Sequence, residues 1–151
     1  MSGRLTGKTV WVTGAGRGIG RSIALAMAAD GARLGLSSRT AAELDAVAAE
    51  VAAAGGEAHA VVADAMSLES TLAAAEAIAE ALGTIDVLVN NAGGGVPPRG
   101  DEGLSDAARD DLAFMDNVDL NLFSAYRASQ AVLPGMLAQK DGRIINIGSG
   151  Y

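Results

Sequence analysis

The sequence predicts an α/β domain built on a doubly wound parallel sheet. Short runs rich in Val, Ile and Leu alternate with longer Ala-rich stretches that have helical spacing. Each short run is apolar over about five or six residues, which is typical of strands covered on both faces. Helical crossovers of this length give parallel strands with right-handed connections. The expected order of elements is therefore β-α-β-α-β-α-β-α-β.

Composition supports one domain over residues 1–151, of which 50% are apolar. A chain of this length buries about 68–70% of its surface, and its apolar fraction excludes disorder. The net charge of −7 excludes a broad basic surface for nucleic acid or anionic lipid. The absence of cysteine excludes disulfides, zinc fingers and a thiol nucleophile, and we expect no metal site. Without an apolar run long enough for a membrane span or a signal peptide, we expect a cytoplasmic protein.

The strands are expected over Thr9–Thr13, Arg33–Ser37, Ala58–Val62, Ile85–Asn90 and Arg143–Gly148. The first helix is expected to start near Gly18, with Ile19, Ile23 and Met27 on one face, and to end at Gly31. The alternation of strands and helices thus begins within the first third of the chain.

The second helix is expected to open with a capping box, in which Thr40 and Glu43 satisfy backbone donors reciprocally. Its apolar stripe is Leu44, Val47 and Val51. These three residues are expected to face the sheet.

The third helix is expected to begin at Ser67 and end at Gly83. Its apolar stripe comprises Leu68, Leu72, Ala75, Ile78 and Leu82. A longer helix is expected over Asp110–Gln139, with a kink at Pro134. The stretch Gly93–Asp106 is rich in Gly and Pro, and we expect a flexible loop there.

A glycine-rich turn follows the first strand, and Gly14, Gly18 and Gly20 form a TGxxxGxG pattern. Such a turn lets the backbone approach a pyrophosphate, and the N-terminus of the following helix points its free N–H groups at the anion. The alternative is a tight turn of purely structural kind, but the position between a strand and a helix favours dinucleotide binding. The residues expected to bind the cofactor here are Gly14, Gly16, Arg17, Gly18, Ile19 and Gly20.

The end of the second strand bears on the choice between NADP and NAD. Enzymes that prefer NAD place an acidic residue there, whereas this sequence has Ser38 and Arg39. Arg39 and Arg17 offer two guanidinium groups to a 2′-phosphate, with the Ser38 hydroxyl beside them. The alternative is that both arginines are solvated surface residues. The sequence favours NADP over NAD.

Several motifs together resemble the short-chain dehydrogenase/reductase family. The segments that carry the resemblance are Thr13–Gly20, Asp64, Asn90–Gly93, Asn121 and Gly142–Ser149. Five landmarks occur in the family's order over essentially the whole chain. The resemblance implies a Rossmann-like fold with strand order 3-2-1-4-5.

The resemblance also implies roles for individual residues. Asp64 would bind the adenine amino group, or else it is an acidic residue flanking a helix. The segment Asn91, Ala92 and Gly93 would stabilise the central sheet and line the cofactor. Asn121 would help to hold a water in a proton relay, and Phe114 before it is most simply a core residue. Ser149 would be the catalytic serine that orients the substrate carbonyl or hydroxyl. The alternative for Asn121 is an ordinary asparagine within a helix, and the alternative for Ser149 is an ordinary serine in a turn.

The sequence departs from the family pattern at its C-terminal end. The family's catalytic tyrosine lies about a dozen residues after the serine and is followed four positions later by a lysine. Tyr151 lies too close to Ser149 to be that tyrosine, and no lysine follows. His59 and Lys140 are expected to be structural or surface residues. The fifth strand is expected to be an uncovered sheet edge, and the helix used for dimerisation by homo-oligomeric relatives would lack its partner.

These observations leave more than one function open. The first hypothesis is an NADP-dependent oxidoreductase that transfers hydride between nicotinamide and a small-molecule carbonyl or secondary alcohol, represented by an incomplete chain. The alternatives are a non-catalytic dinucleotide-binding module and an inactive fragment. No nucleic-acid or membrane partner is expected.

Overall fold

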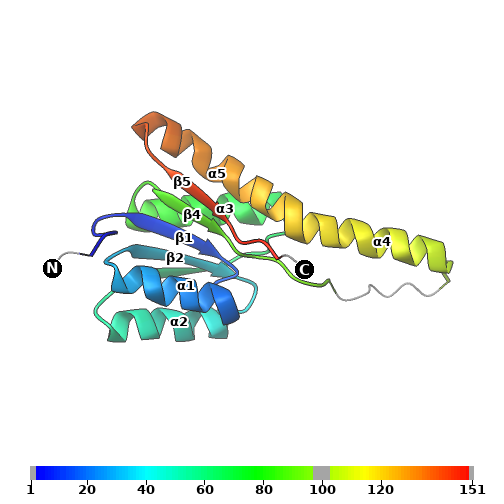
Figure 1. Ribbon diagram of the computed structural model, residues 1–151, viewed down its shortest axis with the longest axis horizontal. Helices are drawn as coiled ribbons and strands as arrows, with labels where there is room; N and C mark the ends of the chain where they lie inside the picture. Colours follow the sequence, from blue (N-terminus) through cyan, green and yellow to red (C-terminus); the bar gives the residue numbers. More distant parts are fainter. Residues whose placement is uncertain (1–2, 97–102, 150–151) are drawn as a thin grey trace.

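The computed structural model describes residues 3–96 and 103–149 and contains a five-stranded parallel sheet (Figure 1). The strands are β1 (Thr9–Thr13), β2 (Arg33–Ser38), β3 (Glu57–Val62), β4 (Val87–Asn90) and β5 (Arg143–Asn146). Their spatial order is β3-β2-β1-β4-β5, which confirms the expected topology. Part of the expected loop over Gly93–Asp106 lies outside the described residues. Tyr151 also lies outside them.

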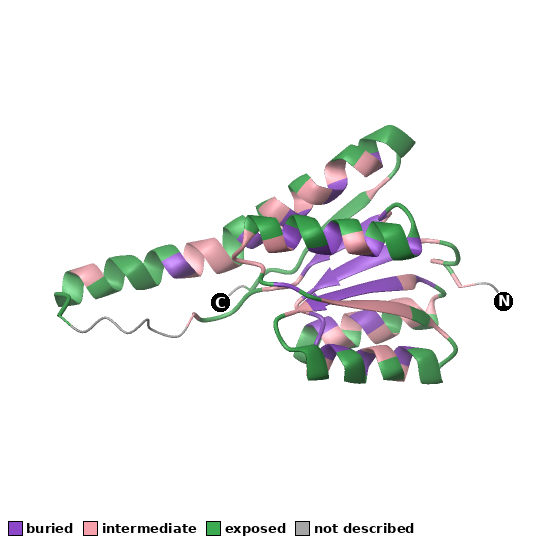
Figure 2. Ribbon diagram, turned by 180° about the vertical axis from the view of Figure 1, so that it is seen from behind, coloured by how far each residue is buried: buried purple, intermediate pink, exposed green. Residues whose placement is uncertain are grey.

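Helices cover both faces of the sheet (Figure 1). They are α1 (Gly18–Ala29), α2 (Ala41–Ala53), α3 (Leu68–Leu82), α4 (Asp106–Val118), the π-helix η1 (Asp119–Phe123) and α5 (Ser124–Gln139). The pair α1 and α2 packs on one face, and the pair α3 and α5 packs on the other. The helix α4 extends away from the sheet, and most of it is exposed (Figure 2).

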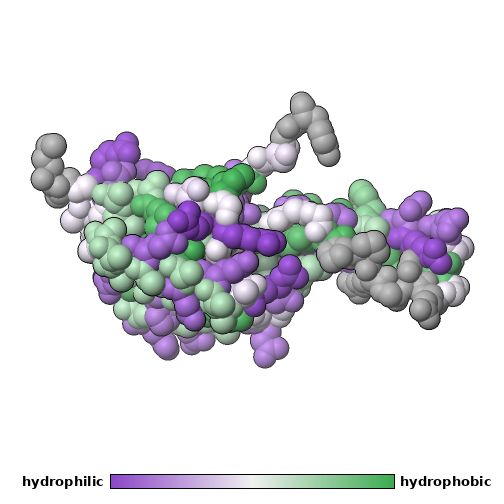
Figure 3. Space-filling model, turned by 90° about the horizontal axis from the view of Figure 1, so that it is seen from below, coloured by the Kyte–Doolittle hydropathy of each residue, from purple (hydrophilic) through white to green (hydrophobic). Residues whose placement is uncertain are grey.

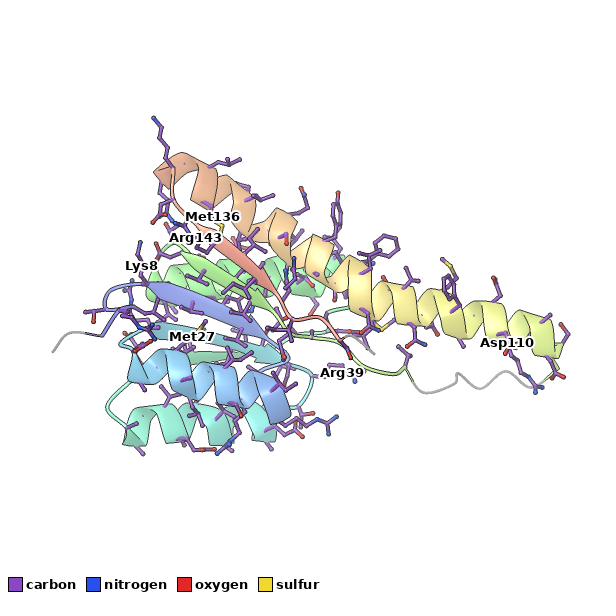
Figure 4. All side chains as sticks on the ribbon, in the orientation of Figure 1. Lys8, Met27, Arg39, Asp110, Met136 and Arg143 are labelled. Atoms are coloured by element: carbon purple, nitrogen blue, oxygen red, sulfur yellow. The ribbon has the colours of Figure 1, made fainter. Side chains whose placement is uncertain are left out.

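Alternation along β1 divides the core into two layers. Val10 and Val12 face α1 and α2, whereas Trp11 faces α3 and α5, and all three side chains are buried. Met27 of α1 and Met136 of α5 approach the sheet from these two opposite sides (Figure 4). Both faces of the central strands are therefore covered, as their continuous apolar sequence predicts.

The predicted helical faces need correction at several positions. Ile19, Leu68 and Leu72 are exposed, although the spacing placed them on the buried stripes of their helices. Ile19 and Leu68 lie in the first turns of α1 and α3, whereas Leu72 lies in the second turn of α3, where the buried residues are Thr71, Ala74 and Ala75. Phe114 is also exposed, because the part of α4 that carries it does not lie on the sheet. The prediction that Phe114 is a core residue was therefore wrong.

The long C-terminal helix begins at Asp106 rather than Asp110. Between α4 and α5 the backbone takes π-helical geometry over Asp119–Phe123, which the sequence did not predict. The helix α5 remains helical across Pro134. The departure from α-helical geometry therefore lies one helical segment before the expected position, around Asn121.

Of the two helix starts predicted from the sequence, one has the expected side-chain cap and the other does not. Ser67 caps α3, because its hydroxyl accepts a hydrogen bond from the Ser70 N–H at 3.1 Å. Thr40 is the N-cap residue of α2, but its side chain makes no capping hydrogen bond. The reciprocal capping box between Thr40 and Glu43 is therefore not formed, which leaves the Glu43 side chain available for other contacts.

The strand β5 forms one edge of the sheet, and all four of its residues are exposed. Hydrophilic and apolar side chains are interspersed over the molecular face seen in Figure 3. Within the described residues, no helix is long and apolar enough to cross a membrane.

Candidate functional site

The glycine turn connects β1 to α1 in a conformation that requires glycine. Gly14 and Gly18 have φ values of +63° and +55°, which side chains of L-residues rarely adopt. A Cβ atom on Gly20 would clash with the Gly14 carbonyl oxygen and lie 2.5 Å from Asn91 Nδ2. The turn is therefore closely packed against the segment that follows β4.

Asn91 and Thr13 fasten this turn to the sheet. The Asn91 side-chain amide donates to the carbonyl oxygens of Thr13 and Gly14, each at 3.1 Å. The Thr13 hydroxyl accepts from the N–H groups of Asn91 and Ala92, each at 3.0 Å. These bonds hold the carboxyl ends of β1 and β4 together beneath the turn.

The N-terminus of α1 carries backbone donors without helical partners. The Arg21 N–H donates to the Arg17 carbonyl at 3.2 Å, so the N–H groups of Gly18, Ile19 and Gly20 precede the first hydrogen bond of the helix. Arg17 is the N-cap residue, and its side chain makes no capping bond. Such a helix start favours an anion, because the free N–H groups and the helix dipole both place partial positive charge at the N-terminus.

A cavity of about 540 Å³ lies along the carboxyl ends of the strands. Its volume is within the range of about 300–1,000 Å³ that is typical of ligand sites. The cavity is lined by all the residues to which the sequence analysis gives a cofactor-binding or catalytic role, namely Gly14, Gly16, Arg17, Gly18, Ile19, Gly20, Ser38, Arg39, Asp64, Asn91, Ala92, Gly93, Asn121 and Ser149. Residues far apart in the sequence thus meet at the edge where open α/β sheets bind ligands.

Sequence reasoning missed several lining residues, among them Trp11, Thr13, Glu43, Ser124 and Ile147. The Trp11 indole N–H donates to the Ser37 hydroxyl at 2.9 Å inside the core. Only the β1 alternation could have indicated that Trp11 faces the α3 side. The failure of the capping box leaves Glu43 at the cavity wall, and no sequence signal predicts that outcome.

Four charged side chains, those of Arg17, Arg39, Glu43 and Asp64, line the cavity at the end that lies beyond β1, β2 and β3. Figure 4 places Arg39 at the end of the sheet opposite Lys8 and Arg143. Arg17 is exposed, with its Nη1 atom 4.0 Å from Glu43 Oε1. The predicted pair of cations is therefore present, but acidic residues accompany it.

Asp64 follows β3 at the same edge of the sheet and is exposed. One of its carboxylate oxygens accepts from the Met66 N–H at 2.9 Å, and its own N–H donates to the Ser70 hydroxyl at 3.0 Å. Asp64 thus orders the turn that leads into α3 while it lines the cavity. Its adenine-binding role remains a proposal.

Asn121 lies in the π-helix and fastens the segment after β4. Its Oδ1 atom accepts from the Gly94 N–H at 2.8 Å, and its Nδ2 atom donates to the Gly94 carbonyl at 2.9 Å. Nδ2 also donates to the Asn117 carbonyl. Short π-helical segments occur frequently at functional sites, and this one turns Asn121 toward the cavity.

Ser149 lies beyond β5 at the other end of the cavity and is exposed. The pairing of β4 with β5 continues toward it, because the Ile147 N–H donates to the Asn90 carbonyl at 2.9 Å. The buried Asn90 amide also donates to Asn146 Oδ1 at 2.9 Å and to the Ser129 hydroxyl at 3.3 Å. These contacts fix the direction in which β5 presents Ser149.

Two residues that the sequence predicts to be structural or surface residues lie away from the cavity. His59 is in the middle of β3, where it pairs with Gly35, and Lys140 has left-handed geometry at the end of α5. Neither lines the cavity.

At the amino ends of the strands Lys8 contacts Asp86 and Asp141, and hydrogen bonds to both carboxylates raise the pKa of Lys8. In turn the Lys8 ammonium lowers the pKa of Asp141.

The fold and the glycine turn define a Rossmann-like α/β protein. The chain belongs to the short chain dehydrogenase family, whose model matches residues 8–151. It is 42% identical over 147 residues to the oxidoreductase UcpA of Escherichia coli K12, and this match covers 97% of the chain and 53% of that protein. The chain spans about half the length of the curated relatives it matches.

Solved structures of the same family superpose closely. A metagenomic short-chain oxidoreductase in complex with NADP is 38% identical with a TM-score of 0.83, and the match covers 97% of this chain and 64% of that one. A 7α-hydroxysteroid dehydrogenase complexed with NADH and 7-oxo glycochenodeoxycholic acid is also 38% identical, with a TM-score of 0.85 and coverage of 97% and 55%. Relatives with similar structures have thus been crystallised with either nicotinamide dinucleotide.

Proposed function

We propose that this chain forms the nicotinamide-dinucleotide-binding domain of an oxidoreductase and prefers NADP to NAD. The observation that carries the proposal is that one cavity holds both the residues proposed for phosphate binding and the residues proposed for the reaction. The α1 N-terminus and Arg17 lie toward one end, whereas Asn121 and Ser149 lie toward the other. An elongated dinucleotide requires such a separation between its phosphate site and its reacting site.

The residues present fit this cofactor. The left-handed Gly18 has open space where a Cβ atom would point, so a pyrophosphate can approach the backbone there. Gly14, Gly16, Gly18, Ile19 and Gly20 would bind the pyrophosphate through this turn. The adenine would contact Asp64, and the segment Asn91–Gly93 would line the centre of the cofactor.

The Arg17 and Arg39 guanidinium groups, with the Ser38 hydroxyl, would bind a 2′-phosphate. A neutral ribose hydroxyl would interact more weakly with the same guanidinium groups. This difference in charge is the reason for the proposed preference for NADP.

The bound nicotinamide would supply hydride transfer, and the substrate would be a small-molecule ketone or secondary alcohol. Ser149 would donate a hydrogen bond to the substrate oxygen and orient it. Asn121 would hold the segment after β4 and help to order a water near the reacting oxygen. The family's catalytic tyrosine and lysine have no counterparts among residues 1–151 at the family's spacing.

Fluorescence titrations with NADPH and NADH test the cofactor assignment, and Trp11 in the cavity wall provides a second optical signal. Arg39→Asp should lower the ratio of NADPH to NADH affinity by about ten- to a hundredfold, since a hydrogen bond between charged groups contributes about 1.5–3 kcal/mol. Lys140→Asp makes the same change in charge outside the cavity and is the matched control. Tighter binding of NADH than of NADPH by the wild type would contradict the proposed preference.

The non-catalytic module remains the alternative, because its binding cavity would be the same. The coding sequence beyond Tyr151 separates the two functions. A Tyr-x-x-x-Lys motif within about fifteen codons would support the oxidoreductase, at the spacing from which a tyrosine can reach the substrate oxygen. A stop codon there would favour binding without turnover.

A further inference from the structure

Glu43 extends from the first turn of α2 into the cation-bearing end of the cavity. A Cβ atom built on Gly16 would lie 2.9 Å from Glu43 Cβ, 3.0 Å from Glu43 Oε2 and 3.0 Å from Ser38 Oγ. The carboxylate and the serine hydroxyl therefore both border the glycine turn. Ser38 is one of the residues to which the 2′-phosphate of NADP is assigned above.

Glu43 also faces one of the cations assigned to that phosphate. Its Oε1 atom lies 4.0 Å from Arg17 Nη1, at the limit of an ion pair. Within residues 3–96 and 103–149, the Glu43 carboxylate accepts no hydrogen bond, and the capping contact that would have engaged it is not formed. The carboxylate is thus able to interact with a ligand in the cavity.

We infer that Glu43 is a specificity-determining residue that opposes the preference for NADP set by Arg17 and Arg39. This inference rests on the proposed function. A 2′-phosphate has to compete with the Glu43 carboxylate for Arg17 and is repelled by it. A ribose 2′-hydroxyl is neutral and can donate a hydrogen bond to a carboxylate, so NADH meets no such opposition.

The guanidinium of Arg17 faces Glu43, and that of Arg39 lines the same cavity. Arg17 lies at the start of α1, and Arg39 lies between β2 and α2. Removal of the Glu43 charge changes this group from two cations and one anion to two cations alone. Because Arg17 is largely exposed and Glu43 is partly exposed, we expect a modest change in selectivity rather than its reversal.

The test is the variant Glu43→Gln, which keeps the shape of the side chain and removes its charge. We expect the ratio of NADPH to NADH affinity to rise by about two- to tenfold, and to rise less at high salt because exposed charges are screened. Asp45→Asn removes one charge from an exposed position of the same helix outside the cavity, and it is the matched control. It should leave the ratio near that of the wild type.

A double-mutant cycle with Arg17→Gln separates a local effect from a general one. In the Arg17→Gln background, Glu43→Gln should raise NADPH affinity less than it does in the wild type. An unchanged ratio in Glu43→Gln, or equal shifts in Glu43→Gln and Asp45→Asn, would overturn the inference while the proposed function stands. A wild type that binds neither NADPH nor NADH would overturn both.

Discussion

Asn121 and Gly94, which both line the cavity, exchange two hydrogen bonds, one in each direction. The side-chain oxygen accepts from the Gly94 N–H at 2.8 Å, and the side-chain amide donates to the Gly94 carbonyl at 2.9 Å. A Cβ atom on Gly93 would lie 2.8 Å from the same side-chain oxygen. The π-helix and the segment after β4 therefore hold each other in place.

Removal of this reciprocal pair should release the segment. Asn121→Leu should lower the hydrogen-exchange protection of the Gly94 amide and reduce the free energy of unfolding by about 1–2 kcal/mol, because each net hydrogen bond contributes about 1 kcal/mol. Asn121→Asp keeps the acceptor and loses the donor, so it should be intermediate. Unchanged Gly94 protection in Asn121→Leu would contradict the described contact.

Gly20→Ala should destabilise the protein more than Gly18→Ala does. The added methyl group at position 20 would clash with backbone and with the Asn91 amide, whereas position 18 has open space and a left-handed backbone. We expect a loss of about 1–3 kcal/mol or more at position 20 from overpacking, and of about 1–2 kcal/mol at position 18 from its left-handed backbone. Urea denaturation followed by circular dichroism gives both values. Equal losses would show that the turn yields to the methyl group.

Ser37→Ala should leave the buried Trp11 indole N–H without its partner. That N–H donates to the Ser37 hydroxyl at 2.9 Å, and both residues are buried. An unsatisfied buried donor costs about 1–3 kcal/mol, and this loss should appear in the free energy of unfolding. The double variant with Trp11→Phe should lose less than the sum of the two single variants, because the unpaired donor is gone. Strict additivity would show that the hydrogen bond contributes nothing.

Acid should weaken the contact between α1 and α2. Hydrogen bonding to Arg21 lowers the pKa of Glu50, so the folded state holds the Glu50 proton less tightly than the unfolded state does. This stabilisation is present above the ordinary glutamate pKa of about 4.3 and is lost as the pH falls through the lowered value. The stability difference between the wild type and Glu50→Gln should therefore shrink between pH 7 and pH 3 in urea denaturation. Glu57→Gln removes an exposed carboxylate elsewhere, and its difference should shrink less.

The sequence predicts the sheet well for a physical reason. A strand buried on both faces must be apolar throughout, so the runs around Val10, Leu34 and Leu88 identify their strands unambiguously. The glycine turn can be predicted equally well from the sequence, because positive φ values at Gly14 and Gly18 restrict the residue type. The lining of the cavity follows from this order of elements.

Other features depend on tertiary contacts that no local pattern encodes. Ile19 and Leu72 have the helical spacing of a buried stripe, yet both are exposed, and in α3 the residues Thr71 and Ala74 are buried instead. The π-helix at Asn121 arises within a sequence that reads as an uninterrupted helix. Thr40 and Glu43 match the capping-box spacing, but the Glu43 side chain borders Gly16 instead, and only the folded turn reveals that neighbour.

The bond between Asn91 and Gly14 joins residues 77 positions apart. A nascent chain emerging from the ribosome exposes the glycine turn long before Asn91 is available to fasten it. Since distant pairings must await loop closure, the backbone of the glycine turn gains its final shape only after β4 has been synthesised and inserted beside β1. The turn is thereby completed late in the maturation of this polypeptide.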